Sequence, residues 1–211
     1  TIATVIPPRN EKQIVKTNTT EQPEVQKITI RHATSGSFFF LKLDTTSIGG
    51  SVQFSGDIEA YATGNTPAGN GAPSVQTTVS AMSNIMEHGA VTVTKNIISD
   101  IEYEYLITFP PSMGNVPLME PFTDKLLPQG LATAVVTTVE EGNIIGGTFR
   151  LSFDGTTTKD IPYDATPTFV REALEDLPAI ETVDVTRSVV DNQRGYEWTI
   201  EFTGAMNDGD V

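Results

Sequence analysis

The stretches YEYLITF (residues 103–109) and YEWTIEF (residues 196–202) decide how this chain folds. In both, aromatic and aliphatic residues occupy every second position, with polar residues between them except at Leu106, and each position of the first stretch has a counterpart 93 residues later (196 − 103). Alternation with a period of two is typical of a strand that has one buried face and one face in water. The recurrence predicts that the chain contains one folding unit twice.

Other segments recur in the same order along the chain. VTVTK at 91–95 matches VDVTR at 183–187. A set of apolar residues at helical spacing recurs as well, namely Val75, Val79, Met82 and Ile85 against Val170, Leu174, Leu177 and Ile180. The segment 114–116 matches 209–211. Collinear matches of this kind favour a tandem repeat over chance similarity.

The repeats predict an α+β, β-rich fold with mostly antiparallel sheet, in which each copy runs strand, strand, strand, helix, strand, strand. The predicted boundaries are an extended arm at 1–23, a first module at 24–119, a linker at 120–133 and a second module at 134–211. In this alignment EVQKITI (24–30) and AVVTTVE (134–140) are the first strands of the two modules. We also expect the array to continue on both sides of this sequence.

Local signals support the second module. Thr166 and Pro167 are typical of a helix N-cap and first turn, and Pro178 predicts the end of that helix. Asp154-Gly155 predicts a tight hairpin turn. The helix of the first module is expected from Val75 to Met82 and is weaker, because threonine and serine interrupt it.

Composition excludes several classes of protein. The 211 residues have a formal net charge of −14, which would repel a phosphate backbone, so nucleic acid is not an expected partner. There is no cysteine, which excludes disulfides, thiolate metal sites and a cysteine nucleophile. No apolar run reaches the ~18 residues of a membrane-spanning helix, so the chain is not expected to span a membrane.

The second copy resembles a tandem repeat module of giant secreted or cell-surface proteins of algae and protists, with similar repeats in bacterial surface and phage virion proteins. The resemblance is carried by GGTFRLSFDG (146–155), IPYDA (161–165), VREALEDLPAI (170–180) and the closing FTGAMNDGDV (202–211). It implies a structural role such as the shaft of an extracellular appendage, for example a flagellar hair (mastigoneme). No catalytic residue belongs to this resemblance.

An enzyme is not favoured. The two histidines, His32 and His88, occupy unrelated positions in the two copies, whereas acid-base catalysis needs partners arranged around such a residue. Carboxylate pairs such as Asp160 with Asp164, or Glu175 with Asp176, are expected from acidic composition alone. No catalytic residue and no organic cofactor is predicted.

Two ligand sites are predicted at the level of motifs. Asp208 and Asp210, in the turn 207–210, offer hard oxygen ligands that suit calcium, with Glu120 and Asp124 as further candidates on the linker. A solvated polar turn is the simpler explanation of the same residues. Asn18 begins an Asn-Thr-Thr glycosylation sequon in the arm.

The sequence therefore predicts a structural repeat protein of an extracellular filament, appendage or surface coat, localised outside the cell or at its surface. Its expected partners are other copies of itself and neighbouring repeats. The arm at 1–23 and the segment 117–133 are expected to add strands to exposed sheet edges of adjacent modules or copies. The alternative is an adhesin that binds a glycan or a protein through its loops, particularly 64–73.

Overall fold

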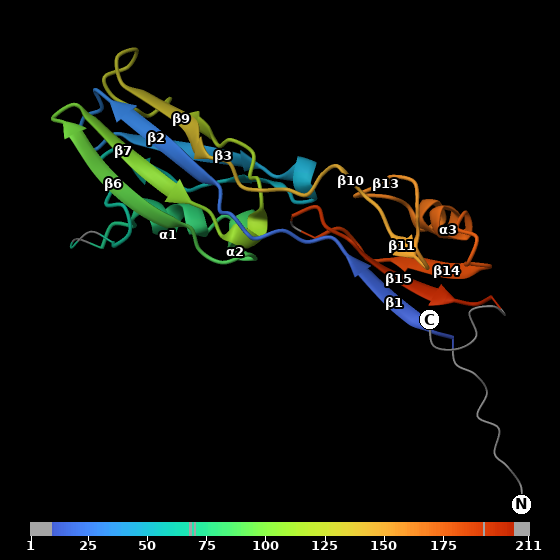
Figure 1. Cartoon of the computed structure of the whole chain (residues 1–211). Helices are drawn as coiled ribbons and strands as arrows, with labels where there is room; N and C mark the ends of the chain where they lie inside the picture. Colours follow the sequence, from blue (N-terminus) through green and yellow to red (C-terminus); the bar gives the residue numbers. More distant parts are fainter. Residues whose placement is uncertain (1–9, 68, 70, 192, 205–211) are drawn as a thin grey trace, which may run out of the picture. The chain divides into compact units, whose positions relative to one another are not determined.

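The computed structural model describes residues 10–204 except 68, 70 and 192 (Figure 1). The chain divides into two compact units. The central unit runs from Thr20 to Asn143, and the terminal unit combines the described residues up to Thr19 with those from Ile144 onward. The central unit is therefore inserted, along the sequence, between the two parts of the terminal unit.

The described residues of the central unit form two short α-helices, two 3₁₀ turns and eight strands. In chain order these are β2 (Val25–Arg31), β3 (Phe38–Asp44), η1 (Thr46–Ile48), β4 (Val52–Phe54), β5 (Ile58–Glu59), α1 (Val75–Ser80), α2 (Ser83–Met86), β6 (Thr92–Ser99), β7 (Glu102–Thr108), η2 (Pro111–Met113), β8 (Glu120–Phe122) and β9 (Thr133–Glu140).

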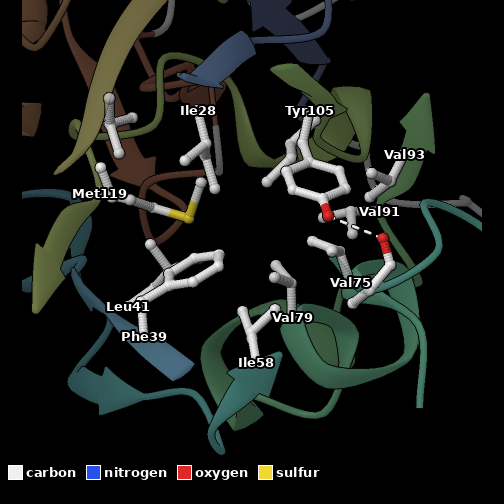
Figure 2. Packing of buried hydrophobic residues seen from close by; sticks show 14 of the residues in the cluster. Ile28, Phe39, Leu41, Ile58, Val75, Val79, Val91, Val93, Tyr105 and Met119 are labelled. Atoms are coloured by element: carbon white, nitrogen blue, oxygen red, sulfur yellow. Dashed lines mark hydrogen bonds between the residues drawn. The ribbon is translucent and has the colours of Figure 1, made fainter. Parts of the chain in front are cut away.

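A four-stranded antiparallel sheet with the order β6-β7-β2-β9 forms one layer of the central unit. The second layer is β3, which pairs with β4, β5 and β8, together with α1 and α2. Figure 2 shows the two layers facing each other, with Ile28 and Tyr105 on the sheet side and Val75 and Val79 on the helix side. All four residues are fully buried, as the period-two and helical patterns predict.

In the terminal unit, the part of the chain that the structure describes forms one α-helix and seven strands. These are β1 (Lys12–Lys16), β10 (Thr148–Phe149), β11 (Ser152–Phe153), β12 (Thr156–Thr157), β13 (Ile161–Pro162), α3 (Pro167–Glu175), β14 (Val183–Arg187) and β15 (Glu197–Phe202).

The sheet of the terminal unit has the order β1-β15-β14 and is antiparallel (Figure 1). Strand pairs β10–β13 and β11–β12 form two separate two-stranded sheets of this unit, the latter closed by the turn at Asp154 and Gly155, whose φ angles are 45° and 76°. Its own apolar core centres on Trp198, which is fully buried among residues of α3 and β15.

The predicted β-rich, mostly antiparallel character is confirmed. Helix α3 begins as predicted, since the Thr166 side chain accepts a hydrogen bond from the Phe169 amide and Pro167 occupies the first turn. The expected helix from Val75 to Met82 is interrupted instead. It splits into α1 and α2 at Met82, which has an extended backbone (φ −65°, ψ 128°).

The unit boundaries differ from the predicted ones in two places. Strand β9 (Thr133–Glu140), expected to begin the module at 134–211, pairs with β2 in the central unit. Residues Lys12–Lys16 of the expected arm at 1–23 form β1 and pair with β15. The physical reason is that a strand can join any sheet edge whose hydrogen-bonding groups and apolar face it matches, so its neighbour in sequence need not be its partner.

Candidate interaction surface

A lysine on an aromatic cluster joins sheet and loop in the central unit. The Lys95 ammonium group donates to the carbonyl oxygens of Tyr61 and Ala62, both at 3.0 Å. It lies 4.7 Å from the ring centroid of Tyr103 and 5.3 Å from that of Tyr105. Burial lowers the pKa of Lys95, an effect that the negative charge of Glu59 opposes.

The terminal unit contains the same arrangement with an arginine. The Arg187 guanidinium donates to the carbonyl oxygens of Asp164 and Ala165, the latter at 2.9 Å. It lies 4.1 Å from the ring centroid of Tyr196. The Trp198 indole N–H also donates to Ala165, at 3.1 Å, as the Tyr105 hydroxyl donates to Ala62 at 2.7 Å. In each unit these bonds hold the loop before the helix against the sheet.

Two buried polar side chains at the start of β2 hold the segments that run beside that strand. The Gln26 amide donates to the carbonyls of Val116 and Pro117 at 3.2 and 3.0 Å, and its oxygen accepts from the Met119 amide at 2.9 Å. The Glu24 carboxylate accepts from the Gly142 amide at 2.8 Å. Burial raises the pKa of Glu24, and these hydrogen bonds oppose that shift.

Strand β1 begins with the same pair of residue types. The Gln13 amide donates to the Glu11 carboxylate at 3.0 Å, as the Gln26 amide donates to that of Glu24 at 3.3 Å. The Phe202 amide donates to the Glu11 carbonyl at 2.9 Å, and the Phe109 amide to the Glu24 carbonyl at the same distance. Sequence reasoning missed this Glu-x-Gln recurrence, although it is visible at positions 11–13 and 24–26.

Exposed aliphatic side chains gather at one end of the central sheet. Two of them are among the last residues of β6, one follows in the β6–β7 turn, and two lie between β8 and β9. The loop after β2 bonds both connections, since His32 donates its amide to the carbonyl of Ile101 at 2.7 Å and Thr34 donates to that of Leu127 at 2.9 Å. We call this group the apolar end; its members and exposed fractions are Ile97 78%, Ile98 56%, Ile101 51%, Leu127 48% and Leu131 54%. Clustered exposed apolar residues are typical of protein interaction sites.

The sheet β6-β7-β2-β9 of the central unit and the sheet β1-β15-β14 of the terminal unit each have two edge strands. In the described part of the chain, β6 and β9 border the central sheet, and β14 and β1 border the terminal one. Each edge offers backbone N–H and C=O groups on one side, which another strand can pair with.

The residues predicted for ligand binding are placed as follows. Asn18 is exposed between β1 and β2, where a glycan would have access. Asp208 and Asp210 lie outside the described residues. Glu120 belongs to β8 and forms an ion pair with Lys42 at 3.1 Å. No group of three or more His, Asp or Glu side chains suited to a metal ion occurs among residues 10–204 as described.

The acidic pairs considered for catalysis are separated by other partners. Asp160 accepts from Arg150 at 2.5 Å, which lowers the pKa of Asp160. Asp176 pairs with Lys159 at 3.1 Å, whereas Glu175 accepts from the amide of Val183. Neither pair is assembled as two facing carboxylates by these contacts.

No protein-family model matches this chain, and no curated protein shows significant similarity to it. Within the described residues, no helix has both the length and the apolar character needed to cross a membrane.

Proposed function

We propose that this chain is a structural repeat protein of an extracellular filament, appendage or surface coat. It contains two copies of one module, and these modules associate with other copies of the chain and with neighbouring repeats. The observation that carries the proposal is the duplicate set of contacts in the two units. A basic residue on the strand that follows the helical segment holds the loop before that segment in both units, as Lys95 of β6 does in one and Arg187 of β14 in the other.

The same correspondence extends to the second layer. In the central unit Ser55 donates its amide to the carbonyl of Leu41, and its hydroxyl accepts from the Leu41 amide. In the terminal unit Thr158 makes the same two bonds with Leu151. The pairing of Phe39 with Ile58 likewise has its counterpart in Phe149 with Ile161.

The helices correspond in register although they differ in length. A polar side chain on each helix accepts a hydrogen bond from the first amide of the following strand segment: Ser80 from Val91, and Glu175 from Val183. Each unit also has a separate cluster of buried apolar residues. Shared topology with separate cores is the architecture of a chain that lengthens by adding modules.

The apolar end supports self-association as the way in which these modules work. Exposing five aliphatic side chains at one end of a sheet to water is unfavourable in free energy, and burial against another copy would remove that cost. The net negative charge of −14 keeps the isolated chain soluble, while association removes the apolar area from water.

Electron microscopy of the purified chain, together with sedimentation velocity over a concentration series, tests this function. The expected result is concentration-dependent assembly that Ile97→Lys/Ile98→Lys weakens. The matched control is Val189→Lys/Val190→Lys, which changes an adjacent pair of exposed aliphatic residues outside the apolar end. A chain that stays monomeric at all concentrations, or assembly that both double variants weaken equally, contradicts the proposal.

A further inference from the structure

Strands β1 and β2 are equivalent in their own sheets, and only β2 has neighbours on both sides. Gln13 lies opposite Ile200 as Gln26 lies opposite Ile107. The following alternate positions correspond too, with Val15 opposite Trp198 and Ile28 opposite Tyr105. In the order β6-β7-β2-β9 the far side of β2 is covered by β9, whereas β1 is the last strand of its sheet in the described chain.

The backbone of β1 directs alternate residues outward. Thr17 donates its amide to the Tyr196 carbonyl, and Phe202 donates to the Glu11 carbonyl, so the odd-numbered residues of this strand bond β15. In an antiparallel ladder the intervening residues then point their N–H and C=O groups the other way. The outward groups belong to Lys12, Ile14 and Lys16, and the Ile14 side chain is 64% exposed.

The side chain of Gln13 has unused hydrogen-bonding capacity at the same edge. Gln26, its equivalent, holds three backbone groups of the segment 116–119 and is fully buried. In the described chain Gln13 is half-buried and its one side-chain hydrogen bond is to Glu11. The edge of β1 thus offers both backbone and side-chain groups to a further segment.

The charges at this edge indicate which segment fits. In the central unit Glu140 of β9 lies opposite Val25. The residue of β1 equivalent to Val25 is Lys12, because Lys12 lies opposite Glu201 as Val25 lies opposite Thr108. A strand with the β9 pattern would therefore place a glutamate beside Lys12, whereas a second β1 strand would place lysine against lysine.

We propose that the outer edge of β1, from Lys12 to Lys16, receives an extended antiparallel segment of an adjoining repeat with the residue pattern of Thr133–Gly142. This inference rests on the proposed tandem architecture. The segment would pair with the outward groups of β1 and place an inward valine beside Val15 in the way that Val136 lies beside Ile28. Modules would thereby be joined by strand addition rather than by a flexible tether.

The test uses the full chain and a labelled synthetic peptide of residues 130–143, with binding followed by fluorescence anisotropy. Saturable binding of one peptide per chain is expected. Ile14→Pro removes the outward N–H without removing a bond to β15 and should weaken binding at least tenfold. Ile14→Thr keeps that N–H and should bind as the parent chain does. A peptide with Glu140→Lys should bind less tightly than the parent peptide, and the loss of affinity should be larger at low salt, where charge repulsion is less screened.

Amide hydrogen exchange locates the bound peptide. Protection should appear at Ile14 and Lys16, whereas binding that displaces β9 would change exchange at Lys27 and Thr29. Absence of saturable binding, binding that Ile14→Pro leaves unchanged, or protection at β2 alone overturns the inference. Assembly seen by sedimentation without peptide binding would leave the structural function standing and remove this mode of linkage.

Discussion

Glu24 is fully buried, and its carboxylate accepts hydrogen bonds from the Gln26 side chain and the Gly142 amide. In the same unit the Lys95 ammonium group contacts two carbonyl oxygens and three tyrosine rings. At the residue scale these two groups combine the cost of burying a charge with the bonds that offset it.

Glu24→Gln should change how stability depends on pH. Because burial raises the pKa of Glu24 above 4.5, its contribution to stability is fully present below that pH and falls as the pH rises through the folded-state value. The variant lacks this loss, so urea unfolding should show it gaining on the parent chain between pH 4 and pH 7.

Glu201→Gln is the control of opposite sign. The hydrogen bonds from Lys12 and Asn10 lower the pKa of Glu201, so its contribution is present above pH 4.5 and lost as the pH falls. Parallel pH profiles for Glu24→Gln and the parent chain would contradict the first prediction.

Lys95→Met should destabilise the central unit by about 1–3 kcal/mol, because it removes the charged donor to the Tyr61 carbonyl and one of the two donors to the Ala62 carbonyl. Lys95→Arg should cost less, since Arg187 performs the equivalent task in the terminal unit. Urea unfolding of the two variants checks the ranking. Equal stability of Lys95→Met and the parent chain would show that the cation is dispensable.

At the element scale, the docking of β1 is the feature with the widest consequences, since it joins residues that are 181 (197 − 16) to 189 (201 − 12) positions apart in the chain. Glycine allows this approach: a Cβ at Gly195 would lie 2.6 Å from the Thr17 carbonyl oxygen and 2.7 Å from Asp191 Oδ2. The Asp191 carboxylate also accepts the Gly195 amide at 2.6 Å, which closes the turn before β15.

Gly195→Ala should therefore loosen β1 from β15 and destabilise the terminal unit by about 1–3 kcal/mol. Faster hydrogen exchange at Thr17, whose amide bonds to Tyr196, is the direct readout. Gly146→Ala is the matched control, because a Cβ there meets nothing within 4 Å. If both variants exchange at Thr17 like the parent chain, the close approach at Gly195 is not required.

At the scale of the whole molecule, the central unit has the properties of an independent folding unit. Its two ends lie together, since the Gln22 amide donates to the Asn143 side chain at 3.0 Å, and Val25 lies opposite Glu140. Its core cluster is composed of residues from 28 to 136. Excision at these ends would cut two peptide connections and leave the core intact.

A fragment of residues 20–143 should accordingly unfold in one cooperative transition, followed by circular dichroism during urea titration. A fragment of residues 24–119 lacks β8 and β9, exposes the buried Met119 end of the core and loses the Gly142 bond to Glu24, so it should be less stable or unfolded. Equal stability of the two fragments would contradict this expectation and support the module boundaries 24–119 that the sequence repeat predicts.

Much of the local structure could be predicted from the sequence. The alternation in YEYLITF and YEWTIEF determines which faces of β7 and β15 are buried, and Thr166-Pro167 determines where α3 begins, because these effects act over a few residues. The basic residue that ends VTVTK and VDVTR was visible as a match, but its role was not, since its carbonyl partners are about 30 residues away in sequence.

Only the tertiary structure decided which sheet strands β1 and β9 join. AVVTTVE has a high strand propensity and KQIVK a lower one, but propensity does not name a partner. In the structure the first forms β9 and pairs with β2, and the second forms β1 and pairs with β15. Strand propensity is a local property, whereas pairing depends on edges, buried faces and side chains such as Glu24 and Gln26 that become neighbours only after the chain has folded.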